Sequence, residues 1–153
     1  MRIRTTQSED IPALKLVLDK TQLFPSVMLP GMLDSYFSNP ENEDIWLTLE
    51  DDNSQPIGFC YAAPEQLATG TWNMLAIAVL PEQQGNGFGR LITLELEAML
   101  RDQKSRILIA ETSGTDDFRM TREFYEKAGY TEEARIRDFW DAGDDKVVFW
   151  KRL

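Results

Sequence analysis

The stretch that decides the fold reads Trp72-Asn-Met-Leu-Ala-Ile-Ala-Val-Leu-Pro-Glu-Gln-Gln-Gly-Asn-Gly-Phe-Gly-Arg90, followed by Leu91-Ile-Thr-Leu-Glu-Leu-Glu-Ala-Met-Leu100. Its first part is a short apolar run between Gly70 and Pro81, which is typical of a strand buried on both faces. Its last part has the spacing of an amphipathic helix, with an apolar stripe opposite a polar side. The stripe consists of Ile92, Leu96, Met99 and Leu100. The sequence therefore predicts a central strand, a glycine-rich loop and a helix in direct succession.

Three glycines alternate in the loop between this strand and this helix: Gly85, Gly87 and Gly89. Glycine adopts a positive φ freely and lets another group approach the backbone closely. Several glycines ahead of a helix start favour a nest of N–H groups, and the helix dipole adds partial positive charge there. We therefore expect a phosphate to bind at this loop. A turn without a ligand would need only one glycine.

Two common phosphate-binding patterns do not fit the loop. The Walker A pattern needs Gly-Lys-Ser/Thr, whereas Gly89 is followed by Arg90 and Leu91. The Rossmann pattern needs a third glycine where this sequence has Arg90 or Ile92. One Rossmann feature does fit: Glu111 ends the next apolar run at about the distance at which that pattern has an acidic residue. A nucleotide-binding domain is therefore a distant alternative.

A third pattern fits better. Gln84-x-x-Gly87-x-Gly89, directly after a strand that ends Ala-Val-Leu-Pro81, resembles the pyrophosphate loop of the GCN5-related N-acetyltransferases, the GNAT family. The resemblance implies that the loop binds the pyrophosphate of acetyl-coenzyme A (acetyl-CoA). The residues implied in this contact are Gln84, Gly85, Asn86, Gly87, Phe88, Gly89 and Arg90.

A second family landmark lies near the C-terminus. Phe124-Tyr-Glu-Lys-Ala-Gly-Tyr130 resembles the family's Phe-Tyr-x-Lys-x-Gly-Phe/Tyr, whose tyrosine lies beside the thioester sulfur. The resemblance implies that Tyr125 protonates the leaving thiolate. Many members carry Asn seven residues earlier as a cofactor contact, but this chain has Phe118, which we expect to pack against the pantetheine arm. Because this Asn is missing, an alternative function stays open, that of a non-catalytic acyl-CoA-binding sensor or interaction module. The intact Tyr125 counts against this alternative.

The family resemblance also assigns a role to the backbone of the central strand. In GNAT proteins a bulge in this strand frees N–H and C=O groups that bind the thioester carbonyl and the pantetheine amides. The matching residues here are Ile77, Ala78 and Val79. A backbone N–H at the thioester carbonyl would help to stabilise the developing oxyanion.

The proposed reaction needs a base, because an alkylamine with a pKa of about 10 is protonated at neutral pH. The chain has no histidine, so the base must be a carboxylate or a water that a carboxylate activates. Glu65 ends the strand before the central one, where partial burial would raise its pKa. A solvated loop glutamate is an equally good interpretation of Glu65, and Glu111, at the end of the next strand, is its rival.

Composition limits the function classes. The chain has 153 residues, enough for one sizeable core, and we expect a single N-acetyltransferase domain over 1–153. Its net charge of −10 argues against nucleic acid as a partner. No apolar segment is long enough to span a membrane. The single Cys60, expected to be a small buried side chain, suits a reducing compartment, and we expect a cytoplasmic enzyme. We expect no metal, because histidine is absent and the adjacent pair Asp144-Asp145 cannot form a cage alone.

Hydrophobic periodicity and turn residues predict the remaining elements. Three strands joined by short links imply an antiparallel meander, and the helix after the central strand implies a parallel neighbour. The order β-α-α-β-β-β-α-β-α-β-β is the α/β (α+β) GNAT fold, a mixed sheet of about seven strands with about four helices. The segment after the first helix is interpreted equally well as a helix packed on the sheet and as one wall of a cleft for the acceptor, and both can hold. The acceptor is expected to be a primary amine of a small molecule or peptide, and a homodimer is compatible with the family. The expected bounds outside the quoted stretch are strands 1–5, 44–50, 56–64, 106–110, 130–138 and 146–151, and helices from Ser8 to Lys20, from Gly31 to Phe37 and from Asp116 or Asp117 to Ala128.

Overall fold

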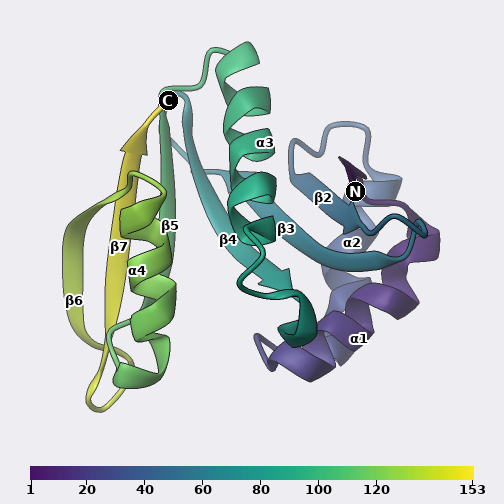
Figure 1. Cartoon of the computed structure of the whole chain (residues 1–153). Helices are drawn as coiled ribbons and strands as arrows, with labels where there is room; N and C mark the ends of the chain where they lie inside the picture. Colours follow the sequence, from purple (N-terminus) through teal and green to yellow (C-terminus); the bar gives the residue numbers. More distant parts are fainter. The chain divides into compact units, whose positions relative to one another are not determined.

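The structure, a computed structural model, describes all residues from 1 to 153. It contains seven strands and four α-helices in the expected order (Figure 1). In chain order they are β1 (Arg2–Thr5), α1 (Ile11–Thr21), α2 (Leu29–Ser38), β2 (Ile45–Glu50), β3 (Pro56–Pro64), β4 (Thr71–Val79), α3 (Phe88–Asp102), β5 (Ile107–Ser113), α4 (Arg119–Lys127), β6 (Thr131–Asp141) and β7 (Asp144–Arg152).

The strands form one mixed sheet in the order β1-β2-β3-β4-β5-β7-β6. Strands β1, β2 and β3 pair antiparallel, and so do β5 with β7 and β7 with β6. Strand β4 pairs parallel with β5, from Thr71 opposite Ile107 to Met74 opposite Ala110. Helix α3 connects these two parallel strands, as a crossover connection must. The prediction of a mixed sheet is confirmed.

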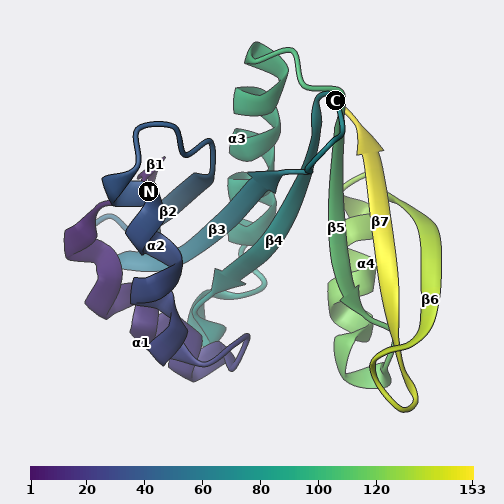
Figure 2. The same ribbon diagram turned by 180° about the vertical axis from the view of Figure 1, so that it is seen from behind.

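The chain forms two compact units, which are described separately. The first unit comprises residues 1–63 and 76–99, and the second comprises residues 64–75 and 100–153. In the first unit, α1 and α2 lie on one face of β2 and β3, and α3 lies on the other (Figures 1 and 2). The core between the two helices and the sheet consists of Leu14, Val17, Leu18, Leu29, Leu33, Trp46, Phe59, Ala76 and Ala78.

Both N-terminal helices differ from their predicted bounds for local reasons. The residues from Ser8 to Asp10 form a short 3-10 turn, so that α1 begins at Ile11 rather than after a Ser8 cap. Asp10 instead accepts a hydrogen bond from the backbone N–H of Gln7 at 2.9 Å. Helix α2 begins at Leu29, earlier than predicted, with Pro30 in its first turn, where a missing N–H removes no helical hydrogen bond.

A buried ion-pair network joins β1, β2 and the turn before α1. The guanidinium of Arg4 donates two hydrogen bonds to Asp10, at 2.7 and 2.8 Å, and its Nε donates a third to Glu50 at 2.7 Å. Thr48 donates to the same Asp10 carboxylate at 3.1 Å. Burial alone would raise the pKa of Asp10, but the hydrogen bonds from Arg4, Gln7 and Thr48 outweigh it and lower that pKa. The network therefore ties the sheet edge to the first helix through charge-assisted bonds.

In the second unit, α4 lies against one face of β5 and β7 (Figures 1 and 2). Helix α4 ends as predicted at Gly129, which has a φ of +88°. The N–H of Gly129 donates to the Glu126 carbonyl and that of Tyr130 to the Tyr125 carbonyl, both at 3.0 Å. Strand β5 extends to Ser113, beyond the predicted end at Ala110, because its pairing with β7 continues as far as Ser113 opposite Lys146. Glu111 therefore lies within a strand rather than at its end.

We predict that Asp10→Asn lowers the free energy of unfolding by about 2 kcal/mol near neutral pH, because Arg4 loses one of its two charged partners while it stays largely buried. Since the folded pKa of Asp10 is lowered, the carboxylate stabilises the fold above its unfolded pKa of about 3.9 and loses that effect as the pH falls through the folded value. Urea unfolding of both proteins from pH 7 to pH 3 measures this difference.

The control is Glu82→Gln, the same chemical change in the exposed ion pair of Lys20 with Glu82. It should leave stability almost unchanged, because water and salt screen an exposed pair. A difference between wild type and Asp10→Asn that stays constant down to pH 3 would contradict the network's role.

Candidate functional site

The glycine loop lies at the N-terminus of α3, as the sequence predicts. A short 3-10 turn, Pro81–Gln83, follows β4, and the loop then turns through Gly85 and Gly87 with φ of +79° and +80°. No heavy atom lies within 4 Å of the position of a Cβ at either glycine. The loop therefore has the backbone conformation that only glycine adopts at low cost, and both glycines have open space beside them for a ligand.

Polar side chains of the loop brace its own backbone. The Gln84 side chain donates from Nε2 to the carbonyl of Val79, at 2.9 Å, and so fastens the loop to the end of β4. Asn86 donates from Nδ2 to the carbonyl of Gln83 at 3.1 Å. The sequence pattern placed Gln84 in the pyrophosphate loop but did not predict this side-chain contact, because the pattern gives no information on local hydrogen bonds.

The pairing of β3 with β4 contains one residue more in β4 than a regular ladder allows. The N–H of Glu65 donates to the Thr71 carbonyl at 2.8 Å, and the N–H of Leu80 donates to the Ile57 carbonyl at 2.9 Å. From Thr71 to Leu80 is nine positions (80 − 71), whereas from Ile57 to Glu65 is eight (65 − 57). An extra residue on one strand is the definition of a β-bulge. The bulged strand contains the residues for which the family resemblance expects one, Ile77 to Val79.

Tyr125 lies on α4 of the second unit and is 3% exposed. Its ring stacks on Phe149, with centroids 5.2 Å apart, and makes edge contacts with Phe124 and Tyr130. This packing fixes the direction of the side chain. Phe118, at the end of the short turn before α4, is 39% exposed, so it can contact a ligand.

The loop between β5 and α4 is held by a residue that the sequence analysis missed. Arg122 donates from Nη1 to the carbonyls of Ser113 and Thr115, at 2.8 and 2.7 Å. These two bonds fix the turn that leads into Phe118. No local sequence signal distinguishes Arg122 from a solvated helix arginine.

The two candidate bases have different surroundings. Glu65 is half-buried and accepts a hydrogen bond from Nδ2 of Asn73 at 2.9 Å, while Oδ1 of the buried Asn73 has no partner. Glu111 forms an ion pair with Lys146, whose Nζ lies 2.9 Å from its Oε2. Lys146 in turn lies over the Phe139 ring, 4.2 Å from its centroid. Glu111 is therefore engaged in a structural contact, whereas Glu65 is held by a neutral amide.

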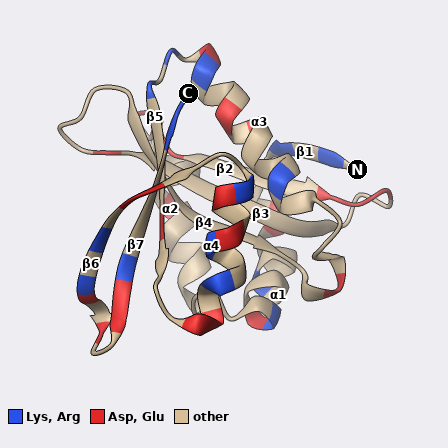
Figure 3. Ribbon diagram, turned by 60° about the vertical axis from the view of Figure 1, so that its left-hand side comes forward, with Lys and Arg blue, Asp and Glu red and all other residues tan.

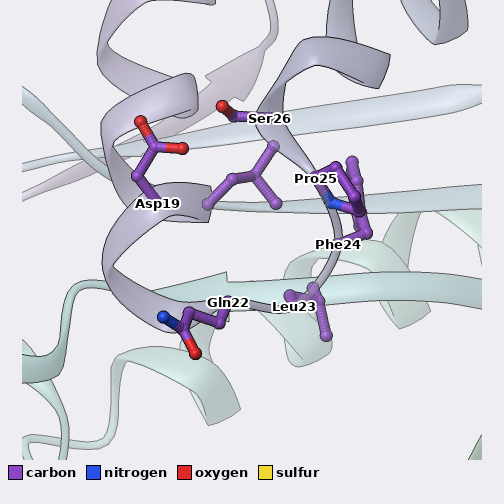
Figure 4. A pocket seen from close by; sticks show the side chains of 7 residues that line it. Asp19, Gln22, Leu23, Phe24, Pro25 and Ser26 are labelled. Atoms are coloured by element: carbon purple, nitrogen blue, oxygen red, sulfur yellow. The ribbon is translucent and has the colours of Figure 1, made fainter.

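An open cavity of about 430 Å³ lies in the first unit where α1 ends. Gln22 terminates α1 in the left-handed conformation, with a φ of 53°. Figure 4 shows Asp19 and Ser26 at one end of the cavity and Gln22 and Leu23 at the other. The segment after the first helix thus lines a hollow of mixed polar and apolar character. Its lining residues are Leu18, Asp19, Gln22, Leu23, Phe24, Pro25 and Ser26. The role of this segment as a wall of the acceptor cleft stays a prediction.

Charged side chains on β6 and β7 pair with one another. Basic and acidic segments alternate along these two strands (Figure 3), and Arg135 bridges Glu132 and Asp145 there.

The remaining candidate features do not form a second site. No cluster of three or more potential metal-binding side chains is present. Cys60 is fully buried, and this burial raises the pKa of its thiol to about 12, so it is an inert core residue. None of the helices combines the length and apolar character needed to cross a membrane.

Comparison with known proteins agrees with this geometry. Residues 41–132 match the family described as the acetyltransferase (GNAT) domain, and this range includes the glycine loop, Phe118 and Tyr125. No curated protein shows significant sequence similarity to the chain.

Solved structures are similar over the whole chain. A candidate GNAT-family acetyltransferase from Desulfovibrio desulfuricans is 29% identical, with a TM-score of 0.90 that covers 99% of this chain and 98% of the other. A ribosomal-protein-alanine N-acetyltransferase from Brucella melitensis is 18% identical, with a TM-score of 0.81 and full coverage of both chains. An aminoglycoside 6'-N-acetyltransferase complexed with coenzyme A is 19% identical, with a TM-score of 0.81 that covers 99% and 97%. The last two share the fold.

We predict that Gln84→Met destabilises the fold by about 1 kcal/mol in urea unfolding, because the Val79 carbonyl loses its side-chain donor. Gln83→Met, the same change one residue earlier, is the control and should have no measurable effect, because Gln83 takes part in the loop contacts through its backbone N–H and carbonyl groups. Equal destabilisation by the two variants would contradict an anchoring role for Gln84.

Proposed function

Because this chain belongs to the GNAT family of acetyltransferases, we propose that it transfers the acetyl group of acetyl-CoA to a primary amine by direct attack. The observation that carries the proposal is the loop between β4 and α3, in which two glycines at positive φ precede a helix N-terminus. We assign this activity to residues 1–153 as one domain, since the similarity to the Desulfovibrio protein extends over 99% of the chain.

The cofactor is proposed to bind along β4 and the loop. The pyrophosphate would lie against residues 84–90 and accept hydrogen bonds from backbone N–H groups of residues 85–90, next to the guanidinium of Arg90, because the N–H of Gln84 donates to the Pro81 carbonyl at 3.2 Å. The pantetheine arm would run beside the backbone of Ile77, Ala78 and Val79, with Phe118 as an apolar contact. Three features support this arrangement: the open space at Gly85 and Gly87, the extra residue in β4, and the exposed ring of Phe118. The similar aminoglycoside 6'-N-acetyltransferase was solved in complex with coenzyme A, which supports a coenzyme A thioester as the ligand.

The chemistry requires proton transfers on both sides of one bond exchange. The acceptor ammonium first loses a proton, for which we propose Glu65, acting through water. The amine nitrogen then attacks the thioester carbonyl carbon, and the carbon–sulfur bond breaks. The nitrogen loses its second proton to water, which leaves the neutral amide. The thiolate takes a proton from the hydroxyl of Tyr125, and the Tyr125 phenolate regains a proton from water. The packing of Tyr125 against Phe149 supports this role, because a fixed ring keeps its hydroxyl in a constant direction.

The acceptor is proposed to be a primary amine of a small molecule or a peptide. The similar structures are named for both kinds, an aminoglycoside and the alanine of a ribosomal protein. The net charge of −10 is favourable for the approach of a cationic amine. We propose that the residues lining the cavity at the end of α1, among them Asp19, form one wall of the acceptor site.

We predict that Tyr125→Phe lowers kcat by about 100-fold and leaves the KM for acetyl-CoA nearly unchanged, because only proton transfer to the thiolate is lost. Release of free coenzyme A thiol, measured against a panel of small amines, aminoglycosides and peptides, follows the reaction.

Tyr130→Phe, which also removes a buried tyrosine hydroxyl from the same aromatic cluster, is the control and should retain most of kcat. If acetyl-CoA binds but no amine in the panel releases thiol from wild type, the transfer reaction fails. If both variants lose activity equally, Tyr125 is a packing residue rather than the acid.

A further inference from the structure

Gly58, in the middle of β3, leaves space for a peptide of β4. A Cβ built at Gly58 would lie 2.7 Å from the carbonyl oxygen of Ala78, closer than real Cβ atoms approach other atoms. The next two atoms are also on β4, Cγ2 of Val79 at 3.2 Å and Cα of Val79 at 3.4 Å. All three atoms therefore belong to the Ala78–Val79 peptide or to the side chain of Val79.

The glycine is not required by the backbone conformation at position 58. Gly85 and Gly87 have positive φ, whereas Gly58 does not. Gly58 is paired with Leu49 of β2, next to a register shift between Leu49 and Glu50. Any residue could adopt its backbone angles. The requirement for glycine is one of space alone.

The short distance shows that the Ala78–Val79 peptide is tilted. In a regular sheet, carbonyl groups lie close to the sheet plane and side chains stand perpendicular to it. The Ala78 oxygen instead lies against the position of the Gly58 side chain. Because a trans peptide points its C=O and N–H in opposite directions, this tilt directs the N–H of Val79 away from Gly58. The carbonyl of Val79 is held separately, by Nε2 of Gln84.

We propose that Gly58 is a positioning residue for the acetyl-CoA site: its missing side chain lets the Ala78–Val79 peptide tilt, and the tilt aims the Val79 N–H at the carbonyl of the thioester or of the pantetheine arm. This inference rests on the proposed function. It assigns the donor to Val79 within the segment from Ile77 to Val79 and explains how a strand outside that segment determines its direction. A side chain at position 58 would push the peptide back toward the sheet plane and turn the donor away from the ligand.

The test is Gly58→Ala, with the dissociation constants of two ligands measured by calorimetry. We expect affinity for acetyl-CoA to fall about tenfold, which corresponds to about 1.4 kcal/mol, close to the upper end for a single hydrogen bond. Affinity for adenosine 3′,5′-bisphosphate, which lacks the pantetheine arm, should stay within about twofold. A variant that was merely less stable would weaken both ligands together or neither.

Gly31→Ala is the matched control. It makes the same change in the same unit, on helix α2, where nothing lies within 4 Å of the new methyl group. It should leave both dissociation constants unchanged. Because alanine favours a helix over glycine, it should also raise the melting temperature slightly.

A second pair of variants applies if Gly58→Ala does not fold. Val79→Gly removes Cγ2, the second contact of a Cβ at position 58, and gives the backbone at position 79 more freedom, so that the Ala78 carbonyl can move away. We therefore expect the double variant Gly58→Ala/Val79→Gly to fold. We expect the double variant to bind acetyl-CoA about tenfold more weakly than Val79→Gly alone. Equal affinities in this pair, or in wild type and Gly58→Ala, would overturn the role of Gly58 while the proposed function stands. Failure of wild type itself to bind acetyl-CoA would overturn the proposed function.

Discussion

The transition from β4 to α3 is the constraint on which the rest of this structure depends. The chain must leave a buried strand and start a helix while leaving open space beside the backbone of the loop. It does so with two glycines at positive φ and with a side-chain bond from Gln84 back to Val79. The open backbone is thus held in place by its own polar side chains. A loop fixed in this way binds an anion without first having to be ordered, which lowers the entropic cost of binding.

Other residues of the first unit hold β4, the strand that leads into this transition, in place. The helices α1 and α2 bury a set of leucines against Trp46, Phe59 and the alanines of β4, so the small residues of the central strand serve as packing surface on one face. On the opposite side of β3, the absence of a side chain at Gly58 accommodates the tilted Ala78–Val79 peptide. The Arg4 network fastens the first helix to the sheet edge with charged groups that are nearly buried. Apolar packing therefore acts directly on the strand that leads into the loop, whereas the ion pairs fix the sheet edge and the start of the first helix.

Much of the fold could be predicted from the sequence, because its signals are local. The apolar run, the alternating glycines and the helical stripe of residues 72–100 each occupy consecutive positions, and Gly129 ends α4 as expected. The misses depend on contacts between distant residues. Strand β5 ends at Ser113 because β7 continues to pair with it, which places Glu111 beside Lys146. Arg122, Gln84 and Gly58 likewise acquire their roles from backbone carbonyl groups that no periodicity identifies.

The central claim is that the loop after β4 binds acetyl-CoA, and the melting temperature of the purified protein with and without this ligand tests it most directly. A ligand at 100 times its dissociation constant stabilises the native state by roughly 2.7 kcal/mol, a shift of several degrees for a domain of this size. We expect acetyl-CoA to raise the melting temperature by such an amount, and NAD and ATP at equal concentration to leave it unchanged. No rise with acetyl-CoA, or an equal rise with NAD, would contradict the assignment of this loop.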